Sequence, residues 1–159
     1  MIMYVLDSSA LMHLFDYYYE SRFPTLWELF NQGVDCGQFT SVREVRNEID
    51  GHYNKERKIN LWARDNSKIF TTPSENEMLL VQDIFKIEHF QAIISRRNLL
   101  AGKPVADPFV VAKAKFINGV VVTIEANRPN GAKIPNICEC FNTKCLSLEE
   151  FMEAEKWRF

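Results

Sequence analysis

Four acidic residues stand at positions where a parallel sheet could bring them together. Asp7 and Glu125 each follow a continuous apolar run. Glu44 lies in the first turn of the predicted helix after the second strand, and Asp107 begins the predicted helix that precedes the most apolar strand. Ligands of open parallel sheets bind beyond the carboxyl ends of the strands, where the following helices also begin. We therefore expect these carboxylates to converge at one edge of the sheet.

Converging carboxylates repel one another, so such a group needs bound protons or a hard cation. Mg²⁺ or Mn²⁺ suits oxygen ligands and keeps coordination positions open for phosphate oxygens and water. The arrangement is typical of metal-assisted phosphodiester hydrolysis. Glu48 lies one helical turn after Glu44 and could reach the same space, so the spacing leaves both residues as candidates.

Each acid also has a purely structural interpretation, because carboxylates are favoured at helix starts. Ser41 and Glu44 have the spacing of a capping box. Asp107 followed by Pro108 has the pattern of an N-cap with proline at the first helical position, and Asp7 could cap the helix after the first strand. Taken singly, each residue favours a structural role. Their joint placement on one edge favours a site.

The elements that must position these acids alternate between strands and helices. Apolar runs predict strands at residues 2–6, 38–40, 69–71, 119–124 and 144–146. Apolar residues at helical spacing predict helices over 8–20, 24–33, 41–51 and 74–100, and from residues 107 and 147 onward. Because helices lie between successive strands, we expect an α/β fold with a mostly parallel sheet.

Length and charge narrow the classes of function. The 159 residues are expected to form a single domain over 1–159, and a hydrophobic fraction of 47% supports one core. A formal net charge of −2 excludes a strongly basic nucleic-acid footprint, so contact with a polyanion needs a local patch or a bound cation. The chain has no apolar run of about 18 residues and no leader pattern, so we expect a cytoplasmic protein without a membrane partner.

Four blocks of the sequence resemble the PIN-domain ribonucleases and keep the order of that family. They span residues 2–127 and read Val-Leu-Asp7-Ser-Ser-Ala-Leu-Met, Thr-Ser-Val-Arg-Glu44-Val-Arg-Asn-Glu48-Ile, Val-Ala-Asp107-Pro-Phe-Val-Val-Ala-Lys-Ala and Val-Val-Val-Thr-Ile-Glu125-Ala-Asn. The tail, Ile-Pro-Asn-Ile-Cys138 to Cys145-Leu-Ser-Leu, looks like a PIN subgroup classified without an assigned function. The resemblance implies a three-layer α/β/α sandwich with about five strands and a Mg²⁺ or Mn²⁺ site that cuts single-stranded RNA.

The resemblance also implies roles for individual residues. Asp7 and Asp107 would be metal ligands, and Ser8 would support Asp7 through its hydroxyl. Glu44 would take the second acidic position, with Glu48 as its competitor. The fourth catalytic position departs from the common Thr-x-Asp pattern, because this chain has Thr-Ile-Glu125, whose longer side chain could reach a metal through water.

The partners follow from the same resemblance. Many small stand-alone members are toxins of toxin–antitoxin pairs, which implies an RNA substrate and a cognate antitoxin protein. Candidate RNA-binding residues are the basic side chains of the third predicted helix and of the window 54–68, and each also fits a solvated surface: Arg43, Arg46, Lys55, Arg57 and Lys58. The aromatic run of residues 17–19 could stack on unpaired bases, or pack on the core or on a partner.

A second function stays open beside the nuclease. In that alternative the chain is a catalytically inactive PIN-like module that binds RNA or another protein, and the acids act mainly as helix caps. Dependence on a divalent metal separates the two, because the enzyme needs the ion and the module does not. The sequence leaves the RNA target and the oligomeric state open, a homodimer included.

Overall fold

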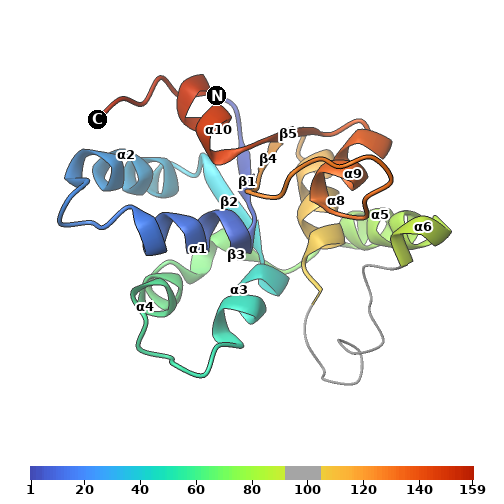
Figure 1. Cartoon of the computed structure of the whole chain (residues 1–159). Helices are drawn as coiled ribbons and strands as arrows, with labels where there is room; N and C mark the ends of the chain where they lie inside the picture. Colours follow the sequence, from blue (N-terminus) through green and yellow to red (C-terminus); the bar gives the residue numbers. More distant parts are fainter. Residues whose placement is uncertain (92–104) are drawn as a thin grey trace.

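A parallel five-stranded sheet forms the centre of the protein. The structure is a computed structural model that describes residues 1–91 and 105–159. The strands are β1 (Tyr4–Leu6), β2 (Phe39–Val42), β3 (Phe70–Thr71), β4 (Val120–Val122) and β5 (Lys144–Leu146). Their order in the sheet is β3-β2-β1-β4-β5, and every neighbouring pair is parallel. Helices cover both faces of the sheet (Figure 1), which confirms the predicted three-layer α/β/α fold.

The helices follow the strands in the alternation that the sequence predicts. Before residue 92 they are α1 (Ser8–Tyr17), α2 (Pro24–Asp35), α3 (Arg43–Asp50), α4 (Lys58–Asp65), the 3₁₀ turn η1 (Ser67–Ile69), α5 (Glu75–Phe85) and α6 (Glu88–Gln91). After residue 104 they are α8 (Asp107–Phe116), α9 (Ile134–Cys140) and α10 (Leu148–Ala154). The part of the predicted helical stretch that covers 92–100 lies outside the described residues. Over the ranges that are described, none of the helices has both the length and the apolar character needed to cross a membrane.

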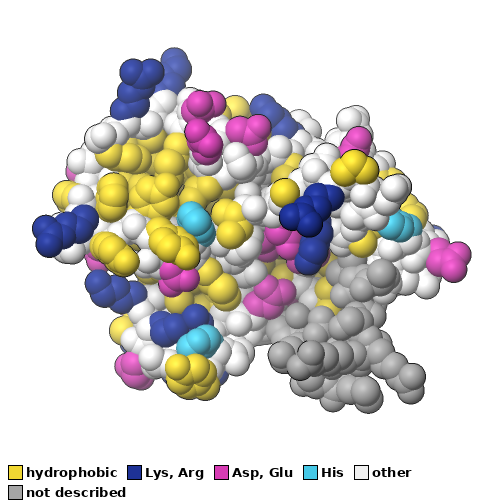
Figure 2. Space-filling model, in the orientation of Figure 1, with side chains coloured by type: hydrophobic (Ala, Val, Ile, Leu, Met, Phe, Trp, Pro, Cys, Tyr) yellow, Lys and Arg dark blue, Asp and Glu magenta, His cyan; other side chains and the backbone are white. Residues whose placement is uncertain are grey.

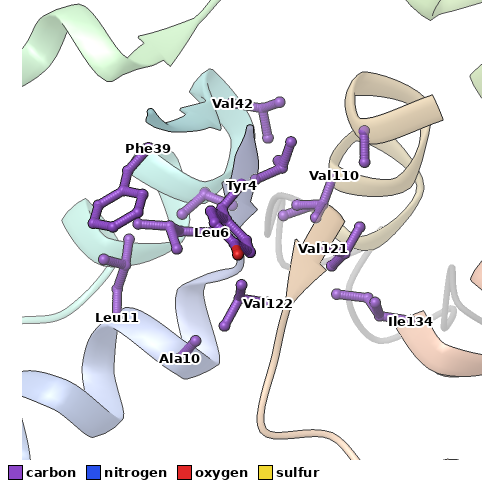
Figure 3. Packing of buried hydrophobic residues seen from close by; sticks show 14 of the residues in the cluster. Tyr4, Leu6, Ala10, Leu11, Phe39, Val42, Val110, Val121, Val122 and Ile134 are labelled. Carbon is purple, nitrogen blue, oxygen red and sulfur yellow. The ribbon is translucent and has the colours of Figure 1, made fainter. Parts of the chain in front are cut away.

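The core forms on both faces of the central strand. All three residues of β1 are buried, as are those of β2 and β4 on either side of it. The sequences of such strands are continuous apolar runs, because helices cover both faces of a parallel sheet and bury every side chain. Figure 3 shows strand side chains packed against residues of the flanking helices, among them Leu11, Val110 and Ile134. This packing fixes the carboxyl ends of β1, β2 and β4, where the candidate site residues begin.

Helix α3 begins two residues later than the sequence predicts. Ser41 belongs to β2, and its Oγ donates a hydrogen bond to the carbonyl oxygen of Leu6 at 2.6 Å. Val42 occupies the N-cap position, and no side chain caps the helix. The predicted capping box between Ser41 and Glu44 is therefore wrong, because the Ser41 hydroxyl is used to join β2 to β1.

Candidate active site

Asp7 is buried at the carboxyl end of β1, where it is only 2% exposed. Its Oδ2 accepts hydrogen bonds from the Ser9 hydroxyl at 2.5 Å and from the Thr123 hydroxyl at 3.1 Å. Asp7 stands at the N-cap position of α1, yet its side chain makes no capping hydrogen bond. Within the described part of the chain, its Oδ1 is buried and has no hydrogen-bond partner. A buried oxygen without a partner is costly, so this atom is suited to receive a ligand.

Of the two glutamates on α3, Glu48 is the one that the structure joins to the other acids. Its Oε2 accepts a hydrogen bond from the Ser8 hydroxyl at 2.5 Å, and its Oε1 accepts one from the backbone N–H of Ala106 at 3.0 Å. Glu48 thereby links the start of α1 to the start of α8. The resemblance implied that the Ser8 hydroxyl supports Asp7. In the structure this hydroxyl donates to Glu48 instead.

Glu44 makes different contacts although it is also buried, at 6% exposed. Its Oε1 pairs with the guanidinium of Arg43 at 2.9 Å. Its Oε2 is buried without a hydrogen-bond partner among the described residues. The resemblance in sequence favours Glu44 over Glu48 as the second acid. The geometry reverses that order, because only Glu48 is tied to the residues around Asp7 and Asp107.

Asp107 and Glu125 complete the group from the start of α8 and the end of β4. Asp107 is the first residue of α8, whose N-cap position is Ala106, so the aspartate does not act as the predicted N-cap. Glu125 follows β4, and its Oε2 accepts a hydrogen bond from the backbone N–H of Ile134 at 3.0 Å. We call Asp7, Glu48, Asp107 and Glu125 the acid cluster. Figure 2 shows acidic side chains gathered near the centre of one face of the protein.

The members of the acid cluster repel one another in a poorly hydrated place. Burial, followed by repulsion from Glu125, Asp7 and Glu48, raises the pKa of Asp107 to about 8. Burial is also the first cause that raises the pKa of Asp7, of Glu48 and of Glu125. Raised pKa values caused by burial and like charges are typical of functional sites. At neutral pH Asp107, whose pKa is about 8, therefore retains a proton that an isolated carboxyl group would have lost.

Lys133 contributes positive charge to the same place. Its ammonium group opposes the rise in the pKa of both Asp107 and Glu125. Lys133 is exposed at the N-cap position of α9, next to Ile134, whose N–H holds Glu125. Lys133 could not be assigned to the site from the sequence, because it follows a loop with no recognisable spacing to the acids.

The donor set fits Mg²⁺ or Mn²⁺, since all four side chains offer oxygen and Asp7 has an unpartnered one. Even so, over the residues that the structure covers, no three acidic, histidine or cysteine side chains are arranged to hold a metal ion as they stand. Backbone amides hold Glu48 and Glu125 in place, so ion binding would require side-chain adjustment. A cavity of about 590 Å³ with Thr123 and Glu125 in its lining opens beside the cluster.

Most of the predicted RNA-binding residues have partners within the protein. Arg43 pairs with Glu44, and Arg46 pairs with Asp50 at 2.9 Å and donates to a backbone carbonyl of α4. Arg57 donates to the side chain of Asn60 and to the carbonyl oxygen of Ile49, and Lys55 donates to the carbonyl oxygen of Asp50. Lys58 is exposed at the start of α4 and lines a cavity together with Arg57. We therefore regard Lys58 as the strongest of the five candidates.

Ser9 and Thr123 also support the site, and sequence reasoning did not assign them this role. The signal was present, because Ser9 lies two residues after Asp7 and Thr123 two residues before Glu125. Their hydroxyls lie 3.1 Å apart and both donate to Asp7 Oδ2. Together they orient Asp7 so that its other oxygen stays unpartnered.

Comparison with known proteins gives a family but no activity. No curated protein matches the chain. Residues 4–159, nearly the whole chain, match the sequence model of one family, whose description is "Domain of unknown function (DUF4411)". The chain belongs to this family of unknown function, DUF4411.

Proposed function

We propose that the protein is a metal-dependent endoribonuclease that binds Mg²⁺ or Mn²⁺ at the acid cluster and hydrolyses single-stranded RNA. The observation that carries the proposal is the gathering of four carboxylates from separate segments at one edge of the sheet, where Asp7 is buried and the other three are partly buried. Burial and the repulsion among them raise the pKa of Asp107 to about 8. A divalent cation would neutralise this charge. The same cation would allow a protein of net charge −2 to approach a polyanion.

The residues of the chain have distinct parts in this proposal. Asp7, Glu48 and Asp107 would hold the ion, and Glu125 would hold it directly or through water. The bound ion would supply an activated water and would stabilise charge on the phosphate. Ser9 and Thr123 orient Asp7, while Ser8 and the N–H of Ala106 orient Glu48. Asp107 retains a proton at neutral pH before the ion binds, so loading the site would release it.

Comparison of Glu48→Gln with Glu44→Gln tests which glutamate belongs to the site. We expect Glu48→Gln to lower the rate of RNA cleavage by about tenfold or more, because it removes a charge from the cluster. Glu44→Gln should change the rate by less than about threefold, since its partner is Arg43 rather than the cluster. Cleavage rates at saturating Mn²⁺ measure both effects. A larger loss in Glu44→Gln than in Glu48→Gln would contradict the assignment.

Lys133→Met should move two properties in opposite directions. Without the ammonium group, the acid cluster is more negative, so its affinity for Mn²⁺ should rise by a few fold. Affinity for RNA in EDTA should fall by a similar factor, because a cation beside the proposed phosphate position is lost. Lys133→Arg should preserve RNA affinity, and Lys86→Met, at an exposed lysine of another region, should change neither property. If Lys133→Met raised both affinities or lowered both, Lys133 would not act as a cation beside the acid cluster.

The alternative, a catalytically inactive RNA-binding or protein-interaction module, has one observation in its favour. The carboxylates of Glu48 and Glu125 are already occupied by backbone amides in the structure. The test is to incubate purified protein with an unstructured RNA in Mg²⁺, in Mn²⁺ and in EDTA. Cleavage that requires the ion supports the nuclease, whereas RNA binding without cleavage under all three conditions supports the module.

The toxin role is a further proposal that rests on the resemblance to PIN-domain toxins. Under this proposal a cognate antitoxin would cover the acid cluster, with an arginine or lysine among the carboxylates. Induced expression should then arrest growth, and co-expression of a neighbour-encoded partner should relieve the arrest. A partner that co-purifies but leaves RNA cleavage fully active would contradict this mode of inhibition.

A further inference from the structure

A second cavity, of about 320 Å³, lies at the far end of α1 from the acid cluster. Its walls are aromatic and come from Phe15, Tyr18, Tyr19 and Trp27. Arg57 and Lys58 from the start of α4 line it as well. We call this cavity the aromatic pocket. Its volume falls in the range of sites that take small organic ligands.

Contacts around the aromatic pocket hold its walls in place. The indole N–H of Trp27 donates to the carbonyl oxygen of Tyr18 at 2.6 Å, and the rings of Phe15 and Trp27 lie 4.6 Å apart. Trp27 is 5% exposed, so its ring is fixed in the core. Tyr19, in contrast, is 57% exposed at the rim. The pocket therefore combines a rigid aromatic base with an accessible aromatic side chain.

Polar groups around the pocket carry both signs of charge. Lys58 is exposed and offers an ammonium group suited to a phosphate. Asp16 and Glu20 also line the pocket and offer carboxylates, which accept hydrogen bonds from amino groups such as that of cytosine. An apolar peptide would leave these charges unpaired. A nucleotide presents an aromatic face, an anionic phosphate and N–H donors together, so it matches the pocket better.

The pocket lies on a path that starts at the acid cluster. Helix α1 begins at Ser8, directly after Asp7, and reaches the pocket at Phe15 and Asp16. The eight helical steps from Ser8 to Asp16 span about 12 Å. Figure 2 shows acidic side chains and an apolar area on the same face of the protein. A single strand could therefore cross both places, separated by only a few nucleotides.

We propose that the aromatic pocket binds one unpaired nucleotide of the RNA strand that is cut at the acid cluster. The base stacks against Tyr19 and the fixed rings behind it, and Lys58 contacts its phosphate. The carboxylates of Asp16 and Glu20 favour a base with an exocyclic amino group over uracil. This inference rests on the proposed function, since it gives the RNA a second contact at a fixed position from the cut.

The test measures nucleotide binding in EDTA, so it requires neither metal nor cleavage. AMP, CMP, GMP and UMP are titrated into the protein while tryptophan fluorescence is recorded, because Trp27 lies in the pocket. We expect saturable quenching at about millimolar concentration, with CMP binding more tightly than UMP. Tyr19→Leu should weaken CMP binding by about fivefold or more, as expected for one lost stacking contact. Lys58→Met should weaken binding of CMP but not of cytidine, which lacks the phosphate.

Matched variants separate the pocket from general surface effects. Tyr17 is 63% exposed, two residues before Tyr19, and does not line the pocket, so Tyr17→Leu should bind CMP like the unaltered protein. Lys86→Met is the matched control for Lys58→Met and should bind CMP like the unaltered protein. Equal losses in Tyr17→Leu and Tyr19→Leu would overturn the proposal. A dimer that forms as the protein concentration is raised, and that Tyr19→Leu abolishes, would also overturn the proposal. In that case the pocket would bind a second copy of the chain.

The outcome also distinguishes this inference from the proposed function. Nucleotide binding that depends on Tyr19 and Lys58, in a protein that does not cleave RNA, would support the pocket and contradict the nuclease. Metal-dependent RNA cleavage without saturable nucleotide binding at about 10 millimolar, a concentration well above the expected dissociation constant, would support the nuclease and overturn the pocket.

Discussion

Asp7→Asn and Asp107→Asn should each lower the rate of RNA cleavage by about a hundredfold to a thousandfold while the fold is retained. Each change keeps the shape of the side chain and removes a negative charge from the acid cluster. Loss of about 3–4 kcal/mol of transition-state stabilisation, which a weakened metal site would cause, corresponds to this factor. Single-turnover cleavage of a labelled RNA in Mn²⁺ measures the rate, and circular dichroism checks the fold.

Asp65→Asn is the matched control for these two variants. Its side chain is 73% exposed at the end of α4, and its neighbour Arg64 lies at 3.8 Å. The same chemical change at this position should leave the rate within about twofold, because surface ion pairs contribute little. If Asp7→Asn and Asp107→Asn cleave RNA as fast as Asp65→Asn, the acids are structural and the nuclease proposal fails.

Without metal, the free energy of unfolding should fall as the pH rises from about 5 to about 8. The pKa of Asp107 is about 8 in the folded protein and has an ordinary value of 3.8, so the folded state holds a proton that the unfolded state has lost in this range. Stability then decreases by about 1.4 kcal/mol for each pH unit from this residue alone. The raised pKa values of Asp7, Glu48 and Glu125 act in the same direction.

Urea unfolding at a series of pH values in EDTA measures this effect. Asp107→Asn should reduce the slope and be more stable than the unaltered protein at pH 8, because the repelling charge is gone. Asp65→Asn should keep the slope. Saturating Mn²⁺ should restore stability at pH 8 to the unaltered protein, since an ion that binds only the folded state stabilises it. A metal-free stability that rises between pH 5 and pH 8 would contradict this account of the acid cluster.

The positions of Asp7 and Glu125 could be read from the sequence, because each follows a continuous apolar run. Such runs mark strands that are buried on both faces, and β1 and β4 are indeed buried. The alternation of these runs with helices was enough to predict the parallel sheet. It also placed Asp107 at the start of a helix, where the structure has it.

The choice between Glu44 and Glu48 could not be read in the same way. Both lie on α3 and are separated by one turn, so periodicity places them on a shared face. Their surroundings depend on where α3 begins, and this was predicted two residues early because Ser41 resembled an N-cap. In the structure the Ser41 hydroxyl bonds to the backbone of β1 instead. The long-range contacts of Glu48 with Ser8 and with the N–H of Ala106 thus decide a question that local spacing left open.

The role of Lys133 and the existence of the aromatic pocket also could not be predicted from local sequence patterns. Lys133 approaches Asp107 and Glu125 because the loop after β4 returns to place Ile134 against Glu125. The pocket combines the end of α1 with residues of α2 and α4, and such a combination exists only once these helices are packed. The aromatic run at residues 17–19 suggested either stacking or packing, and the structure divides it: Tyr17 and Tyr19 are exposed, while Tyr18 packs against the core.

The most direct test of the central claim is calorimetric titration of the metal-free protein with Mn²⁺ at pH 7 in two buffers of different ionisation enthalpy. We expect one ion per chain and release of about one proton, because Asp107 is mostly protonated before the ion binds. Asp107→Asn should bind at least about tenfold more weakly and release less than half as many protons, while Asp65→Asn should behave like the unaltered protein. Absence of Mn²⁺ binding, or binding that Asp107→Asn leaves unchanged, would contradict the claim that the acid cluster is a divalent-metal site.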